Sequence, residues 1–289
     1  MSIWKKLRPA AEDRKDTFYC GSRPAQLPAL SQVHLLIVKL ILTPLLMWLV
    51  SYASRKWGTG FGGLLSGMPL TSGPVSIYLM IEQGRGFAAV SAVSSLVSIG
   101  AVAMFSLTYG LLCVRQRRIF FCALAALTAF VVSIGALQTL HLSLLPALLL
   151  DLIILSLFLA LLPKPRTAGV KVVYPPWDLP ARMSAATSMV LLVTVGARLL
   201  GPQLSGLLAP IPVLAWPLCI FVHAQQGSDG ALAILRGNLQ GAYGVGVFYT
   251  AVGLLVLNWD PTLTYAIAML SSVLVSIPWL PWRQTARAI

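Results

Sequence analysis

The chain has 289 residues, of which 57% are hydrophobic and only 10% are charged, and its mean hydropathy is +0.83. Soluble domains carry about 25% charged residues, so this composition excludes an ordinary soluble protein and indicates an all-α polytopic membrane protein. The net charge of +13 comes from basic residues that lie mostly between apolar segments, which favours a role in membrane topology over nucleic-acid binding.

Apolar segments long enough to cross a bilayer recur along the chain. A spanning helix needs about 20 apolar residues, and the sequence predicts nine: 33–53, 61–83, 87–112, 119–138, 142–163, 184–200, 204–226, 231–257 and 262–281. The remaining segments are a polar N-terminal tail (1–32), a long loop (164–183) and a C-terminal tail (282–289).

The sequence repeats itself at an offset of 143 residues, which aligns 55–112 with 198–255 without a gap. The matched pairs include Arg55 with Arg198, Pro69 with Pro212, Pro74 with Pro217, Gln83 with Gln226, and Gly84 with Gly227. Apolar composition alone would not bring prolines, glycines, an arginine and a glutamine into register. The sequence therefore predicts two four-helix repeats.

The predicted repeats cover 33–138 and 184–281, and a connector helix in 139–163 lies between them. Because an odd number of five spans separates equivalent helices, the second repeat would enter the membrane from the opposite side. This 4+1+4 inverted-topology plan is typical of secondary transporters.

Basic residues predict the orientation of this plan. One side of the nine spans carries eleven of them: Arg55, Lys56, Arg115, Arg117, Arg118, Lys164, Arg166, Lys171, Arg182, Arg283 and Arg287. The opposite internal loops carry only Arg85 and Arg198, so the basic side is expected to be cytoplasmic, with the C-terminus inside a bacterial inner membrane. The N-terminal tail holds six basic residues against three acids, and its side stays open.

Helices 2 and 7 of this plan, 61–83 and 204–226, contain the paired prolines near their middles. Proline removes a backbone donor and clashes with the preceding turn, and non-helical backbone at membrane depth is tolerated where it is buried in protein or lines a cavity. We expect two broken helices that meet near the midplane and line a substrate site. The alternative is a pair of simple proline kinks with glycines for close packing.

The two breaks differ in chemistry. The first, "GMPLTSGP", offers hydroxyls and a half-helix amino terminus suited to an anion, whereas the second, "APIPVLAWP", is apolar with one aromatic ring. The expected substrate-binding residues are Pro69, Thr71, Ser72, Gly73, Pro74, Pro212, Ala215, Trp216 and Pro217. Local hydrogen bonding of the two hydroxyls, and packing or lipid contact of Trp216, are the alternatives.

Ionisable residues inside spans are functional candidates by default. Asp151 lies near the middle of helix 142–163 and is the first candidate for proton or cation coupling; a neutral or hydrogen-bonded Asp that holds this helix to a neighbour is the alternative. The further candidates for coupling or gating are Glu82, His223, Arg55 and Arg198, for which an interfacial resting place or snorkelling is the alternative.

No catalytic motif, metal-ligand spacing or cofactor-binding motif is found, so an enzyme is not expected. The four cysteines form no CxxC pair. The expected partners are the lipid bilayer, a small-molecule solute and a coupling proton or cation, and a homodimer is compatible with the sequence. No nucleic acid and no metal is expected.

Residues Pro212, Pro217, His223 and Gly227 resemble the Pro-interrupted segment of GlpM-type membrane proteins. Gly60, Gly62, Gly63 and Pro69 are similar to the Gly-rich start of each half of the TauE/SafE-type anion exporters. These resemblances imply transport of a small anion. The sequence thus favours an ion- or proton-coupled secondary transporter of a small anionic or amphipathic solute; the alternative is a non-transporting membrane subunit or assembly factor for an envelope process.

Overall fold

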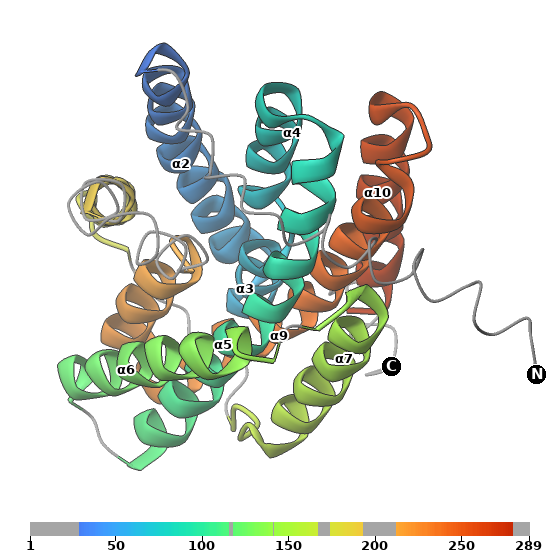
Figure 1. Cartoon of the computed structure of the whole chain (residues 1–289). Coiled ribbons are helices and arrows are strands. Elements are labelled where there is room, and N and C mark those ends of the chain that lie inside the picture. Colours follow the sequence, from blue (N-terminus) through green and yellow to red (C-terminus); the bar gives the residue numbers. More distant parts are fainter. Residues whose placement is uncertain (1–28, 116–117, 141, 167–173, 193–211, 280–289) are drawn as a thin grey trace, which may run out of the picture. The chain divides into compact units, whose positions relative to one another are not determined.

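The computed structural model describes residues 29–115, 118–140, 142–166, 174–192 and 212–279. All regular elements in this part of the chain are helices (Figure 1): α2 (Ala29–Trp57), α3 (Thr59–Gly67), α4 (Ser72–Gln83), α5 (Arg85–Arg115), α6 (Ile119–Gln138), α7 (Leu144–Leu161), a helix over 178–192, α9 (Ala215–Leu255), α10 (Pro261–Ser276) and the short 3-10 helix η1 (Ile277–Trp279). Residues 35–279 belong to one compact unit, which contains every contact discussed below.

Four of the described helices are long and apolar enough to cross a membrane: Arg85–Arg115, Ile119–Leu137, Leu144–Leu161 and Pro261–Trp279. Their outward faces are apolar, since Val132, Ile153 and Leu274 are each more than 60% exposed. Such exposure is compatible with a protein whose outer surface meets lipid. The number of nine spans stays a prediction.

Helix α9 is the centre of the packing. It contacts α3, α5, α7 and α10, while α5 also packs against α4, α6 and α7. The fully buried side chains include Phe105 and Tyr109 from α5 and Phe248 from α9. The apolar core is therefore built around two long helices from opposite halves of the chain.

Glycines bring α3 and α9 into backbone contact. Gly63 and Gly67 on α3 face Ile234 and Asn238 on α9, and a Cβ atom on either glycine would overlap the backbone of α9. Gly237 and Gly241 on α9 face α3 in the same way. Two small-xxx-small motifs thus pack against each other, as they do where membrane helices approach closely.

Helix α7 contacts both long helices, in opposite senses. Along α5, Gly100 lies beside Asp151 and Gly110 beside Leu162, so the two helices run in the same direction. Along α9, Tyr243 bonds Ser156 and Gly253 lies beside Leu144, so that pair is antiparallel. Because 18 residues of helix span about 27 Å, the carboxyl ends of α5 and α9 lie at opposite ends of α7.

The structure confirms an interruption in the helix predicted over 61–83, which becomes α3 and α4. Two other boundaries differ from the prediction. The expected loop 164–183 is already helical at Asp178, because Pro175 and Pro176 precede a carboxylate in the first turn, a favourable helix start. The predicted helices 204–226 and 231–257 join in their described part as α9, across a non-helical Gly227.

Candidate functional site

The first break comprises residues 68–71, between α3 and α4. Met68 is extended, with φ −80° and ψ 163°, and α4 restarts when the backbone N–H of Gly73 donates to the carbonyl of Pro69 at 2.9 Å. Pro74 lies in the first turn of α4, where its missing donor costs no hydrogen bond. The prolines therefore end one helix and begin the next.

Hydroxyl groups surround the start of α4. The Tyr249 side chain interacts with the side chains of Ser72 and Ser95, and the Ser76 and Tyr265 hydroxyls lie 3.0 Å apart. Ser72 thus lies near Tyr249 of α9, whereas Thr71 makes no capping hydrogen bond. Hydroxyl groups from α5, α9 and α10 therefore gather at the start of α4.

An aromatic ring closes the other side of the α4 start. A Cβ atom on Gly73 would lie 3.7 Å from Cζ of Phe248 and 3.4 Å from Cε of Met269. The glycine therefore leaves room for a ring from α9 and a thioether from α10 beside the break.

The second break is described from Pro212 to Leu214. Helix α9 begins at Ala215, and the N–H of Trp216 donates to the carbonyl of Pro212 at 3.0 Å. Ala215 and Pro217 are buried. The indole of Trp216 packs edge-on against Phe105 with 6.0 Å between ring centroids, and its buried Nε1 has no hydrogen-bond partner in the described structure. The second break is thus apolar except for one unused donor.

His223 lies one helical turn before Gly227 and is only 6% exposed. The Tyr109 hydroxyl lies 3.0 Å from its Nδ1. Cys219, one turn earlier on α9, also interacts with this tyrosine. His223 is therefore buried against α5, and its role in coupling or gating stays a prediction.

Contacts at the two breaks correspond at the 143-residue offset. Gly73 lies beside Phe248, and at the equivalent positions Trp216 packs against Phe105. Ser95 interacts with Tyr249, and at the equivalent positions Asn238 donates a hydrogen bond to Ser106 at 3.5 Å. In each pair of contacts, the residue that the first half contributes to one contact is equivalent to the residue that the second half contributes to the other. Gly84 and Gly227, also 143 residues apart, both have positive φ, 87° and 70°. Corresponding contacts of this kind are what a two-fold relation between equivalent surfaces produces.

Asp151 is 2% exposed on α7. Its Oδ1 would lie 3.8 Å from a Cβ atom on Gly100, where Leu137 and Ile154 also approach. Its Oδ2 has no hydrogen-bond partner in the part of the chain that the structure describes. The alternative of a carboxylate that holds helices together through hydrogen bonds lacks such a bond at Oδ2.

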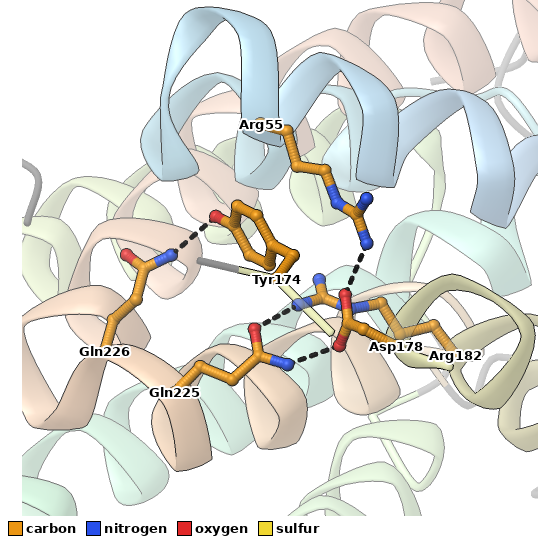
Figure 2. A network of polar contacts seen from close by, with 6 residues as sticks. All are labelled: Arg55, Tyr174, Asp178, Arg182, Gln225 and Gln226. Carbon is orange, nitrogen blue, oxygen red and sulfur yellow. Dashed lines mark hydrogen bonds and ion pairs between the residues drawn. The ribbon is translucent and has the colours of Figure 1, made fainter. Parts of the chain in front are cut away.

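Arg55 joins a polar network, whose members are drawn in Figure 2: Arg55, Tyr174, Asp178, Arg182, Gln225 and Gln226. Arg55 donates through Nη2 to Asp178 at 2.6 Å, and Arg182 donates through Nε to the same carboxylate at 3.0 Å. Gln225 donates to Asp178 and accepts from Arg182 at 2.8 Å. Arg55 is therefore bound to protein, and its role in coupling or gating stays a prediction.

The network fixes the charge of Asp178. Burial alone would raise the pKa of this carboxyl, but the Gln225 hydrogen bond and the two guanidiniums outweigh burial and hold its pKa below the ordinary value. Asp178 is fully buried and Arg182 only 1% exposed. A buried carboxylate that stays charged ties α2, the 174–182 segment and α9 together.

Two predicted residues fall outside what can be placed: Arg198 is not among the described residues, and for Glu82 only the backbone, in α4, is described. The sequence reasoning missed Asp178, Arg182 and Gln225. Asp178 and Arg182 are spaced i,i+4 and could have been recognised as an ion pair on one helix face.

The chain matches no known family model, no curated protein and no solved structure.

Proposed function

We propose that this chain is an ion- or proton-coupled secondary transporter of a small anionic or amphipathic solute, built as two inverted repeats that alternate access to a site between them. The observation that carries the proposal is the correspondence of the two breaks: each broken helix packs on the long helix of the other half, through contacts that match at one offset. Transporters of this plan bind substrate at such paired breaks.

The direction of the long helices supports inversion of the repeat. Gly110 and Gly253 are equivalent at the 143-residue offset, yet they contact opposite ends of α7 through Leu162 and Leu144. Helix α7 would then be the connector that both repeats share. A membrane-spanning connector with one equivalent glycine at each end is the arrangement expected when one repeat enters from each side.

The chemistry of the breaks suits an amphipathic solute. The first break supplies the hydroxyls of Ser72 and Ser76, and the second supplies the Trp216 ring with its unused Nε1 donor. A buried donor without a partner is costly, and a ligand acceptor would satisfy it. An anionic oxygen on a small apolar body would complement both walls.

Asp151 is the proposed coupling group. A carboxylate near the middle of a spanning helix costs about 2.5–3.5 kcal/mol on insertion scales, so such residues commonly serve ion or proton pathways. Asp151 lies on α7, beside Gly100 of α5, and α7 also contacts α9. Protonation there would be felt by both proposed repeats.

A thermal-stability screen of the purified chain against carboxylates, phosphates, sulfonates and amphipathic drugs, at two pH values, tests the proposal. A transported solute should raise the unfolding midpoint of the wild type and lose that effect in Thr71→Val/Ser72→Ala. Uptake of the same solute into proteoliposomes should saturate and should lose its proton dependence in Asp151→Asn.

Two outcomes would contradict the transporter: no solute stabilises the protein while a protein partner co-purifies, or flux does not saturate. A third outcome would be that Asp151→Asn leaves proton-driven uptake unchanged. The first result favours a subunit or assembly factor and the second a channel. The third removes the coupling role of Asp151 alone.

A further inference from the structure

The network around Asp178 holds more positive than negative charge. Its six residues carry two guanidiniums and one carboxylate (Figure 2). Arg182 is 1% exposed and Asp178 is fully buried, so solvent screens neither group well. The two guanidiniums share the single carboxylate of Asp178, so the network carries one surplus positive charge that a second anion would balance.

Arg55 is the more accessible of the two arginines in the network. Its side chain is 28% exposed, and its only hydrogen bond among the described residues runs from Nη2 to Asp178. The guanidinium lies over the Tyr174 ring, 4.5 Å from the centroid, which fixes its plane. A planar guanidinium held in this way presents free N–H donors to a carboxylate or phosphate in the two-pronged geometry that these groups prefer.

Asp178 occupies the position that such an anion would take. Its two oxygens accept from both guanidiniums, as one carboxylate of a bound solute would. The same group begins the helix over 178–192, where the helix dipole also favours negative charge. An internal carboxylate therefore fills an oxyanion-binding arrangement.

The network lies where a solute would leave or enter. Arg55 lies in the last turn of α2, and Gln225 and Gln226 directly precede Gly227, the positive-φ glycine of α9. Charge predicts that Arg55 and the loop containing Asp178 both face the cytoplasm, and the two are in contact.

We propose that Arg55 and Arg182 form a binding site for an oxyanion, a carboxylate or phosphate group, in competition with the carboxylate of Asp178. The proposal deepens the proposed function, since it rests on an anionic solute and gives that solute a first site at the cytoplasmic end. Oxyanion binding displaces Asp178 and so loosens the tie between α2 and α9.

Titration of the purified full-length chain tests the site. The probes are inorganic phosphate and succinate, added at constant ionic strength in an uncharged detergent and followed by calorimetry. We expect Arg55→Gln to weaken binding at least tenfold, because the accessible guanidinium is lost, and Asp178→Asn to tighten it at least tenfold, because the internal competitor is lost. Arg115→Gln removes an exposed charge from the same predicted face and should change nothing.

Equal binding by wild type and Arg55→Gln, or Asp178→Asn that folds but binds no more tightly, would overturn the site. Should Asp178→Asn fail to fold, Arg55→Lys decides the matter. Lysine keeps the positive charge but cannot form the two-pronged contact of a guanidinium, so its affinity for the anion should lie between those of wild type and Arg55→Gln. A lysine variant that binds the anion as tightly as wild type would contradict the proposal.

The anion could come from a free solute or from a lipid headgroup. Nanodiscs of neutral lipid, with and without phosphatidylglycerol, separate the two sources: competition between phosphatidylglycerol and free phosphate, removed by Arg55→Gln, assigns the site to headgroups. Absence of both free anion and headgroup binding rejects the site. Binding is measured separately from flux. Oxyanion binding with no transport would overturn the proposed function and leave this site, whereas transport without binding at Arg55 would overturn this site and leave the proposed function.

Discussion

The two helix starts at Ser72 and Ala215 share a backbone and differ in chemistry. Each begins one residue before an N–H bonded to a proline carbonyl four residues back, from Gly73 to Pro69 and from Trp216 to Pro212. Around the first lie the hydroxyls of serines and tyrosines, and around the second lie an indole, a phenyl ring and thiols.

The difference shows which residues serve geometry and which are free to specialise. The prolines set the break in both places, because proline is tolerated in a first helical turn and disfavours the turn before it. Side chains at the break face the other half of the chain and carry no such constraint. Chemical asymmetry on a common backbone is what an amphipathic ligand would require.

The largest effect is expected where α3 rests on α9. Gly67→Leu or Gly241→Leu would force a side chain into the facing backbone and push α3 and α9 apart beside the first break. Overpacking costs about 1–3 kcal/mol when the surrounding side chains can adjust. Two helix backbones in direct contact cannot adjust in this way, so we expect loss of folded protein on size-exclusion chromatography. Gly135→Leu on α6, where a Cβ atom meets nothing within 4 Å, is the control and should elute as wild type.

Asp178→Asn should rank second. It leaves the buried Arg182 without its counter-charge, which we expect to cost about 3 kcal/mol of unfolding free energy. Since the folded pKa of Asp178 is depressed, its contribution is present above its unfolded pKa of about 4 and is lost as pH falls through the folded value.

Thermal unfolding of wild type and Asp178→Asn across pH checks this sign. The gap between their midpoints should be widest at neutral pH and should close in acid. A gap that widens in acid would mean that the carboxylate does not hold the network together.

Exchanging side chains at equivalent positions sharpens the comparison. Trp216→Ala empties the space beside Phe105; because Trp216 is only partly buried, we expect a loss of roughly 2 kcal/mol in the free energy of unfolding, below the cost of about 3–5 kcal/mol for a fully buried tryptophan. Gly73→Ala meets only the flexible end of Met269 and the Phe248 ring at ordinary contact distances, so it should be neutral or gain up to about 1 kcal/mol from helix propensity. Similar losses in both variants would show that the breaks are packed alike.

The smallest effect is expected from the hydroxyls. Ser72→Ala gives the first break the alanine of the second, Ala215, and removes the interaction of Ser72 with Tyr249, which should cost about 1 kcal/mol. Tyr249→Phe removes the interactions of the hydroxyl with both Ser72 and Ser95, so the double variant should be little worse than Tyr249→Phe alone. Strict additivity in urea or thermal unfolding would rule out the interaction between Ser72 and Tyr249.

Much of the architecture was predictable from the pattern of apolar runs and prolines. Helices 119–138 and 87–112 were located within a few residues, and the break in 61–83 follows from Pro69, because the local chemistry of proline needs no tertiary information. Gly84 and Gly227 were matched as a pair, and both adopt positive φ.

Contacts between distant segments could not be predicted. Nothing in the sequence near Arg55 points to Asp178, 123 residues away, and a snorkelling arginine has the same local pattern as a paired one. His223 was a candidate for coupling or gating, with an interfacial position as the alternative, because it ends an apolar run; its burial against Tyr109 depends on how α5 and α9 cross. The glycine contacts of α3 likewise require knowledge of the partner helix.

Sided labelling tests most directly whether the two halves are inverted. Arg85 and Ser228 directly follow the equivalent glycines Gly84 and Gly227, so inversion puts them on opposite faces of the membrane. Arg85→Cys and Ser228→Cys, each in a background with the four native cysteines replaced, are labelled with a membrane-impermeant maleimide in intact and opened cells. We expect Arg85→Cys to react from outside in intact cells and Ser228→Cys only after opening, whereas labelling of both from the same side would contradict the inverted repeat.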